Sequence, residues 1–402
     1  MAHFVVVGGG QAGASLVAKL RSEGFDGDVT LVCAESVPPY QRPPLSKAYL
    51  LGEMEEDRLF LRPAEYYADN NIRLMLGARV VDLDARARSL TLDGGETLSY
   101  DALALTTGSH PRTLPAKIGG TLDGVLTMRD LHDADAMAPR LTEGAKVLVV
   151  GGGYIGLEAA AVCAKRGLNV TLVEMAERIL QRVAAPETSG FFRDLHQAHG
   201  VTIREGVGLD RFLGDDHITG ALLSDGTELE VDFAVVGVGI MPATTLAAAA
   251  GLTLDNGIYT DVQCRTSDPN IWAAGDCASC LFKGERIRLE SVGNAIDMAE
   301  VAARNMMGQG IEYQPAPWFW SDQYDCKLQI AGLNTGYDAL YVRGDGAARS
   351  HWYYRGAELL AVDAMNDPRG YMIGKRLIEA GKSPAPAVMT DPDTDLKALL
   401  RA

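Results

Sequence analysis

Short apolar runs alternate with helical stretches along the chain, and the first apolar run ends directly in glycines. Residues 4–7 read Phe-Val-Val-Val, and Gly-Gly-Gly-Gln-Ala-Gly follows over 8–13. An alanine-rich stretch of helical character covers 14–20, and a second apolar run covers 29–33. The order of strand, glycine loop, helix and strand is typical of a unit that binds a dinucleotide.

The role of each glycine in this unit follows from its lack of a side chain. Gly8 permits a tight turn, Gly10 lets a pyrophosphate approach the backbone, and Gly13 lets the helix pack close to the strand. The amino end of the helix then faces the phosphates. Glu35 lies 22 residues after Gly13, where a carboxylate can hold a ribose hydroxyl. The predicted ligands in this unit are Gly8, Gly10, Gln11, Ala12, Gly13 and Glu35.

The same pattern returns 143 residues later. An apolar run over 146–150 precedes Gly-Gly-Gly-Tyr-Ile-Gly, and a helix over 157–166 and a strand over 170–173 are predicted to follow. Glu174 ends that strand, and no Arg follows it directly. A carboxylate there accepts hydrogen bonds from the 2′-hydroxyl of NAD and repels the 2′-phosphate of NADP, so NADH is the predicted cofactor. The predicted ligands in this unit are Gly151, Gly153, Tyr154, Ile155, Gly156 and Glu174.

Shorter signals extend the α/β pattern beyond the two units. Two apolar strands end in glycine turns, at Thr107-Gly108 and at Gly239, and a turn and strand lead into Asp276. From residue 323 onwards the pattern changes to strands over 327–332, 340–343, 351–354 and 358–365, with a helix over 369–380. The sequence therefore predicts an α/β fold with two Rossmann-like dinucleotide-binding domains and a small α+β C-terminal domain.

Composition excludes several classes of function. The 402 residues carry 37 Lys and Arg against 53 Asp and Glu, a net charge of −16, which disfavours nucleic acid as a partner. No apolar run has the length of a membrane span, and no signal peptide is predicted because the chain enters a strand directly. The six cysteines are interpreted as reduced thiols of a cytoplasmic protein, and no metal site is predicted.

These motifs, in this order over essentially the whole chain, resemble the flavoproteins with two dinucleotide-binding domains, whose fold is glutathione-reductase-like. The resemblance implies FAD at the first glycine loop, NADH at the second, and Asp276 beside the ribityl chain of FAD. Disulfide reductases of this superfamily carry a cysteine pair where residues 38–47 here contain none. Cys277 and Cys280 form a C-x-x-C pair without a thioredoxin pattern, and are interpreted as small residues near the cofactor, with a redox or metal role as the alternative.

The segment Arg-Pro-Pro-Leu-Ser-Lys over 42–47 resembles instead the FAD-dependent NADH:ferredoxin reductases of bacterial oxygenase systems. Residues 289–292, 317–324, 336–338 and 342–344 match the same branch, whereas Thr106 and Gly293 depart from it. The resemblance implies hydride transfer from nicotinamide C4 to flavin N5, then single-electron transfer to a [2Fe–2S] ferredoxin that feeds a cytochrome P450 or a Rieske oxygenase. Alternatives are an NADH-sensing flavoprotein like apoptosis-inducing factor and an NADH oxidase.

The resemblance also implies roles for single residues. Lys47 is expected near flavin N5, paired with Glu158 of the second glycine-loop helix, and Trp320 beside the isoalloxazine. A cation near N5 stabilises the negative charge that arrives with the hydride. Further cofactor contacts are expected at Arg42, Val80, Thr107, Gly108, Arg129, Val292, Arg182 and Gly239.

Three domains are expected from pattern and resemblance together. Residues 1–112 and 243–322 are expected to form a split FAD-binding domain, 113–242 an NAD-binding domain and 323–402 the C-terminal α+β domain. The last of these carries ten basic and ten acidic residues, so the whole negative charge lies before it. Ferredoxins of this kind are usually acidic, so docking needs a neutral or basic patch, with candidate cations at Arg58, Arg62 and Arg304.

Overall fold

The computed structural model describes residues 1–401, and it divides into two compact units. The first unit contains residues 1–41, 56–110 and 240–317. The second contains residues 42–55 and 111–239, and everything described from Trp318 onwards. Each unit is built around its own parallel sheet, with a glycine loop after the central strand.

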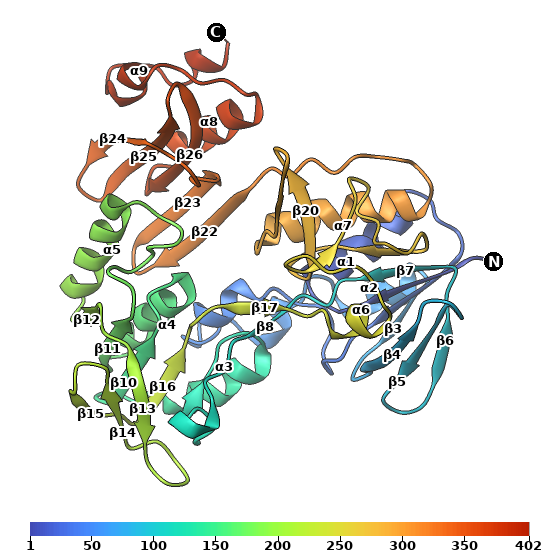
Figure 1. The fold of residues 1–402 in the computed structure, drawn as a ribbon, viewed down its shortest axis with the longest axis horizontal. Helices are drawn as coiled ribbons and strands as arrows, with labels where there is room; N and C mark the ends of the chain where they lie inside the picture. The colour runs from blue at the N-terminus through green and yellow to red at the C-terminus, as the bar shows by residue number, and fades with distance from the viewer. Residues whose placement is uncertain (402) are drawn as a thin grey trace. The chain divides into compact units, whose positions relative to one another are not determined.

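A five-stranded parallel sheet forms the centre of the first unit, in the order β19-β7-β1-β2-β3. Its strands are β1 (His3–Val7), β2 (Asp28–Val32), β3 (Ile72–Met75), β7 (Ala102–Leu105) and β19 (Ile271–Ala273). The central strands are almost entirely apolar because both faces of a parallel sheet are covered. The helices α1 (Gln11–Ser22) and α7 (Val292–Met306) pack side by side (Figure 1).

Smaller sheets and short helices complete the first unit. One antiparallel sheet contains β4 (Val80–Asp84), β5 (Ser89–Leu92) and β6 (Thr97–Ser99), and another contains β18 (Ile258–Tyr259), β20 (Ala278–Phe282) and β21 (Glu285–Ile287). The remaining elements are α2 (Ala64–Asp69), α6 (Thr245–Ala249) and the paired strands β8 (Ser109–Pro111), whose last residue belongs to the second unit, and β17 (Ile240–Pro242).

The second unit repeats the parallel sheet, in the order β12-β11-β10-β16-β9. Its strands are β9 (Val125–Leu126), β10 (Lys146–Val150), β11 (Asn169–Glu174), β12 (Thr202–Glu205) and β16 (Phe233–Val236). The accompanying elements are α3 (Leu131–Met137), α4 (Tyr154–Lys165), α5 (Pro186–Ala198) and the antiparallel strands β13 (Leu209–Leu213), β14 (Gly220–Leu223) and β15 (Glu228–Glu230).

A five-stranded antiparallel sheet belongs to the same second unit, in the order β22-β23-β26-β25-β24 (Figure 1). Its strands are β22 (Trp318–Gln323), β23 (Cys326–Gly332), β24 (Ala339–Asp345), β25 (Ala348–Arg355) and β26 (Glu358–Met365), followed by α8 (Pro368–Glu379) and α9 (Pro386–Thr390). Cys326, Leu328 and Met365 of this sheet share one buried apolar cluster with Leu157 of α4 and Phe192 of α5. The antiparallel sheet and the α4/α5 layer are therefore held by a common core.

The predicted elements are present, with shifted ends. The helices predicted from residues 14 and 157 begin at Gln11 and Tyr154, because the glycine before each is extended and the helix starts immediately after it. The strand β22 begins at Trp318, before the predicted start of the C-terminal domain at 323. The three domain boundaries themselves stay a prediction. Within residues 1–401, no helix combines the length and the apolar character that crossing a membrane requires.

Candidate functional site

The first glycine loop is shaped by two glycines that no other residue could replace. A Cβ on Gly8, whose φ is +117°, would lie 2.2 Å from the carbonyl oxygen of Thr106. A Cβ on Gly13 would lie 2.0 Å from the carbonyl oxygen of Gly8, so the helix presses directly on the loop. Gly10 differs, because a Cβ there would meet no atom within 4 Å. The loop therefore leaves an open side at Gly10, where a pyrophosphate would fit.

The amino end of α1 offers unsatisfied donors at this open side. Its N-cap residue is Gly10, which has no capping side chain, and the first turn contains no acidic residue. By contrast, Ser291 caps α7 and Asp367 caps α8 through side-chain hydrogen bonds. Free N–H groups at a helix amino end bind phosphate oxygens. The residues present therefore fit the dinucleotide phosphates that the sequence predicted here.

Two carboxylates of the first unit are fixed by hydroxyl groups. The Tyr40 hydroxyl donates to Glu35 Oε2 at 2.5 Å, and the Ser109 hydroxyl donates to Asp276 Oδ2 at 2.8 Å. Both carboxylates are half-buried, as ligands of a bound polar group must be to remain accessible. The hydroxyl of Thr107, a further predicted contact, donates to the carbonyl of Ala243 at 2.7 Å.

Thr106, which departs from the resembled pattern, has a structural role. Its hydroxyl oxygen lies 3.0 Å from the carbonyl oxygen of Val7 and 2.9 Å from that of Gly8. The hydroxyl thus ties the end of β7 to the glycine loop that follows β1. Of the other predicted contacts in this unit, Val80 is the buried first residue of β4 and Val292 is the first residue of α7.

The second glycine loop repeats the design of the first. A Cβ on Gly151, at φ +106°, would lie 2.5 Å from the carbonyl oxygen of Gly237, and one on Gly156 would lie 2.0 Å from that of Gly151. A Cβ on Gly153 would meet nothing within 4 Å. Gly153 is also the N-cap of α4 and carries no capping side chain. The second unit therefore fits a second dinucleotide by the same criteria.

Both oxygens of Glu174 are held by backbone donors. Gly152 N–H donates to Oε2 at 2.7 Å, and Ala176 N–H donates to Oε1 at 2.8 Å. The carboxylate is therefore fixed at the end of β11, next to the loop. Met175 beside it is 81% exposed, and Arg182, predicted near the adenosine end of NADH, is exposed.

Lys47 and Glu158 form a close ion pair within the second unit. Lys47 follows the short 3₁₀ helix Pro43–Ser46, and its Nζ lies 2.6 Å from Glu158 Oε2 on α4. Glu158 is 3% exposed and the Lys47 side chain 19%. The Ser46 hydroxyl donates to Oε2 and the Ser321 hydroxyl to Oε1, both at 2.7 Å. A buried ion pair is stable only when its remaining hydrogen-bonding capacity is satisfied, and these two serines do that.

Ser46 and Ser321 are site residues that the sequence reasoning missed. Each is adjacent to a residue that the reasoning did select, Lys47 and Trp320, and this adjacency was the available signal. A serine hydroxyl carries no pattern that distinguishes a carboxylate ligand from a surface residue.

Of the remaining predicted residues of the second unit, Arg42 and Arg129 contact each other, whereas Trp320 and Gly239 lie next to other residues. Arg42 Nη1 donates to the carbonyl of Arg129 at 3.0 Å. The Trp320 ring stacks on Trp318, with centroids 5.6 Å apart. Gly239, at φ +99°, approaches the side chain of Arg112 rather than any of these.

The six cysteines are all buried and free. Cys277 Sγ donates to the carbonyls of Leu105 and Ala274, each at 3.4 Å. Burial raises the pKa of Cys277, and it raises the pKa of Cys280 to about 11. Redox and metal chemistry of cysteine requires the thiolate, which burial disfavours at both positions. Within residues 1–401, no cluster of His, Cys, Asp and Glu has the grouping of a metal site.

Replacing Cys277 and Cys280 by Ser is therefore expected to leave NADH-to-ferricyanide turnover within about twofold of wild type. The hydroxyl of Ser can donate to the same carbonyls, and no thiolate is lost from the reaction. Turnover is measured per bound FAD. A collapse of turnover with FAD still bound would revive the dithiol interpretation.

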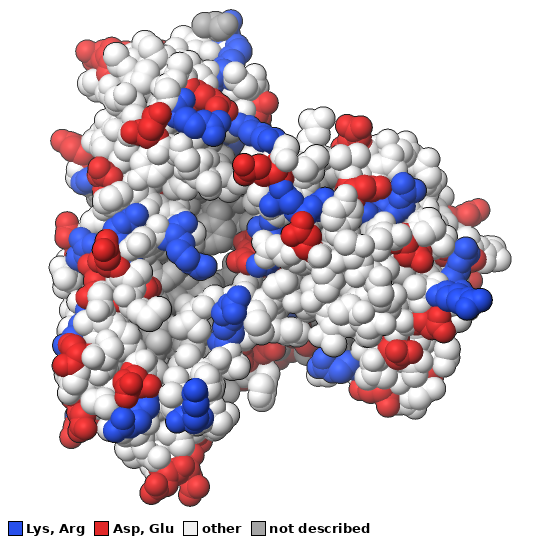
Figure 2. All heavy atoms as spheres, viewed as in Figure 1, with Lys and Arg blue, Asp and Glu red and all other residues white. Residues whose placement is uncertain are grey.

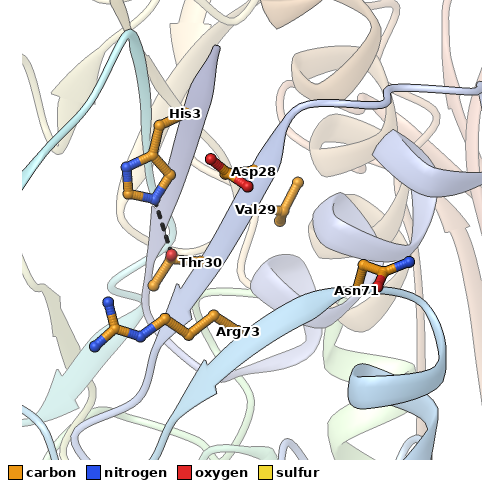
Figure 3. A pocket seen from close by; sticks show the side chains of 6 residues that line it. All are labelled: His3, Asp28, Val29, Thr30, Asn71 and Arg73. Atoms are coloured by element: carbon orange, nitrogen blue, oxygen red, sulfur yellow. Dashed lines mark hydrogen bonds between the residues drawn. The ribbon is translucent and has the colours of Figure 1, made fainter. Parts of the chain in front are cut away.

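A pocket in the first unit lies at the wrong end of the sheet for a cofactor. His3, Asp28, Val29, Thr30, Asn71 and Arg73 line it, at the amino ends of β1, β2 and β3 (Figure 3). Ligands of open parallel sheets bind at the carboxyl ends, where the glycine loop begins. His3 Nε2 and Thr30 Oγ1 lie 2.8 Å apart there, so the polar groups satisfy each other.

Comparisons with known proteins show similarity to reductases that bind pyridine nucleotides along the whole chain. The family model of pyridine nucleotide-disulphide oxidoreductases matches residues 2–299, and a reductase C-terminal model matches 318–400. The chain is 43% identical to the 5,5′-dehydrodivanillate O-demethylase ferredoxin reductase subunit of a Sphingobium species, over 100% of both chains. It is 40% identical to putidaredoxin reductase CamA of Pseudomonas putida, over 100% of this chain and 97% of the relative. A crystal structure of the covalent putidaredoxin reductase–putidaredoxin complex superimposes with a TM-score of 0.96 at 38% identity, covering 100% of this chain and 98% of the other.

Proposed function

Because the chain belongs to the pyridine nucleotide-disulphide oxidoreductase family, we propose that it is an FAD-containing NADH:ferredoxin reductase that supplies electrons to an oxygenase. The observation that carries the proposal is that its similarity to named ferredoxin reductases covers the complete chain, including the C-terminal sheet. The solved relative was crystallised with a ferredoxin partner, putidaredoxin. A [2Fe–2S] ferredoxin, and through it a cytochrome P450 or a Rieske oxygenase, is the partner proposed for this chain.

The site residues have two roles in the proposed reaction: some bind the cofactors, and Lys47 stabilises charge. FAD, when bound, couples a two-electron hydride donor to one-electron acceptors. The free N–H groups at the helix amino ends that follow Gly10 and Gly153 would hold the two pyrophosphates. Glu35 and Glu174 would accept hydrogen bonds from the ribose hydroxyls. Lys47, oriented by Glu158, supplies a positive charge that stabilises the negative charge delivered with the hydride.

The cofactor preference and the compartment follow from groups already described. The fixed carboxylate of Glu174 repels a 2′-phosphate, so NADH is the proposed donor. Six buried free thiols suit a reducing compartment, and we place the protein in the cytoplasm.

Cytochrome c reduction tests the proposal directly. The purified holoenzyme with NADH is expected to reduce cytochrome c rapidly when a [2Fe–2S] ferredoxin is added and negligibly without it. An NADH-sensing flavoprotein would show no dependence on ferredoxin, and an NADH oxidase would consume oxygen at the same rate with or without it. Either of those results would replace the proposal by the corresponding alternative.

Charge on the docking surface should make the reaction sensitive to salt. Basic and acidic side chains are interspersed on the face in Figure 2, so no large field of one sign repels an acidic ferredoxin there. Arg304, one candidate cation, already donates to Glu23 at 3.0 Å, whereas Arg58 and Arg62 are exposed. The two exposed arginines are therefore the better candidates for steering.

The rate with ferredoxin is expected to fall as ionic strength rises, while the KM for NADH changes less, because screening weakens long-range attraction most. Substituting Arg58 and Arg62 by Glu is expected to raise the KM for ferredoxin about 5- to 30-fold, the range of one to two lost attractions of about 1 kcal/mol each. Arg86→Glu, at another exposed arginine of the first unit, is the matched control. A rate that is flat in salt, or rises with it, would show that apolar contacts hold the complex.

A further inference from the structure

A line of buried hydrogen bonds leads away from Glu158 into the C-terminal sheet. The Ser321 hydroxyl donates to Glu158 Oε1 at 2.7 Å, and Gln323 Nε2 donates to Ser321 Oγ at 3.1 Å. His196 Nε2 of α5 lies 2.8 Å from Gln323 Oε1, and the Tyr324 hydroxyl lies 3.2 Å from His196 Nδ1. Ser321, Gln323 and His196 are each 0% exposed. Four residues from β22, its following turn and α5 thus form one continuous line that ends on a carboxylate.

The chemistry of the groups gives this line a single direction. An ionised carboxylate only accepts, so the Ser321 hydroxyl must donate to Glu158. The Gln323 amide then donates to Ser321 and turns its carbonyl to His196, whose Nε2 must carry the proton. His196 Nδ1 accepts from the Tyr324 hydroxyl. Burial lowers the pKa of His196 to about 4, so the ring is neutral at pH 7 and a single tautomer satisfies both contacts.

We propose that Ser321, Gln323 and His196 are positioning residues that keep Glu158 ionised and directed at Lys47. Every dipole in the line points its positive end towards the carboxylate, and aligned hydrogen bonds polarise one another in a buried setting. A carboxamide does not relay a proton in the way that a hydroxyl does, so Gln323 makes the line an orienting device rather than a proton path. The link to catalysis rests on the proposed role of Lys47 in flavin reduction.

Lys47 is the one described charge that faces Glu158 at close range. The elements packed against α4 include the 3₁₀ helix before Lys47, β10, β11, β16 and β22. Asp322 of β22 points to the opposite face from Ser321, because side chains alternate along a strand. Lys146 lies at the exposed start of β10 and Glu174 at the far end of β11, where backbone groups hold it; β16 carries no charge. Besides Lys47, the carboxylate of Glu158 therefore interacts with two neutral donors, the hydroxyl of Ser46 and the hydroxyl of Ser321 at the end of the hydrogen-bonded line.

The pH profile of flavin reduction separates a positioning role from a merely structural one. Reduction of the holoenzyme by NADH is followed by stopped flow between pH 5 and pH 9. Ser321→Ala removes a donor that stabilises the ionised form of a buried carboxylate, so the acid limb of the rate profile should move up by about one to two pH units. Ser321→Thr keeps the hydroxyl and should restore the wild-type profile.

Ser350→Ala is the matched control. Ser350 is also 0% exposed and lies in the same antiparallel sheet, on β25, where its oxygen accepts from Trp352 rather than touching Glu158. Ser350→Ala therefore measures how the loss of a buried hydroxyl elsewhere in the same sheet affects the rate of flavin reduction. A shifted acid limb in Ser321→Ala together with an unshifted one in Ser350→Ala supports the proposal; equal profiles in wild type and Ser321→Ala overturn it.

A second measurement on the unmodified holoenzyme does not depend on activity. In a sample with ¹⁵N-labelled histidine, assigned with the His196→Gln variant, His196 should show a protonated Nε2 and no titration between pH 5 and pH 8. A protonated Nδ1, or titration near the ordinary histidine pKa, overturns the proposal even if Ser321→Ala does not fold. Lys47→Met distinguishes a failure of the proposed function from a failure of the positioning role. Normal flavin reduction in Lys47→Met refutes the proposed function of the Lys47–Glu158 pair. Slow reduction in Lys47→Met together with an unshifted pH profile in Ser321→Ala refutes the positioning role alone.

Discussion

Replacing Lys47 by Met is expected to slow reduction of the bound flavin by NADH about 100- to 1,000-fold, while FAD remains bound. Removing one preorganised electrostatic donor from a closed site costs about 2.7–4 kcal/mol of transition-state stabilisation. Met keeps most of the length of the side chain, being one heavy atom shorter, but not the charge that lies 2.6 Å from Glu158. In Lys47→Met, Glu158 still accepts hydrogen bonds from two serines. The loss of stability is therefore expected to be smaller than for a buried carboxylate that is left with no donor.

Stopped-flow absorbance of the flavin measures this effect without the ferredoxin step. Lys165→Met is the matched control, because Lys165 is an exposed lysine at the end of the helix that carries Glu158. It should reduce at the wild-type rate. If Lys47→Met reduces within about twofold of wild type, Lys47 has no part in the chemistry.

The second large effect concerns the choice between NADH and NADPH. Replacing Glu174 by Ala together with Met175 by Arg is expected to raise the ratio of kcat/KM for NADPH over NADH about 5- to 150-fold, the equivalent of about 1–3 kcal/mol. The change removes a carboxylate that two backbone amides hold in place and adds a cation at a position that is 81% exposed. Arginine there can bind a 2′-phosphate through paired hydrogen bonds.

Steady-state kinetics with both cofactors measure the ratio. Glu177→Ala removes a nearby exposed carboxylate from the same loop and should leave the ratio unchanged. Equal use of NADH and NADPH by the wild-type protein would show that Glu174 does not discriminate.

The sequence predicted best what is encoded locally. Each glycine loop, with the strand before it and the helix after it, lies within twenty consecutive residues and needs only backbone geometry to be recognised. The structure adds the reason that Gly8 and Gly151 are glycines, since a Cβ at either would strike a carbonyl oxygen of another strand end. It also shows that Gly10 and Gly153 are the N-cap residues of the two helices, whereas the residue pattern placed the helix starts at 14 and 157.

Contacts between distant segments were the part that residue patterns could not supply. Lys47 and Glu158 are 111 positions apart, and Ser321 and Glu158 are 163 apart. No periodicity links such positions, and the first pair entered only through a resemblance to known reductases. The start of β22 was missed for a related reason: its aromatic residues were considered for cofactor contact, although a run of aromatics is equally typical of a strand.

The common core of α4, α5 and the antiparallel sheet limits how such reductases can be recombined. Because Cys326, Leu328 and Met365 pack in the same cluster as Leu157 and Phe192, a chimera joined at Trp318 would place foreign side chains against an unchanged partner layer. Protein interiors are packed closely enough that a mismatch of even one methylene group is felt. A crossover that carries α4 and α5 together with the sheet keeps that layer intact. The cohesive unit of exchange is therefore the packed layer, even though its parts are separated along the chain.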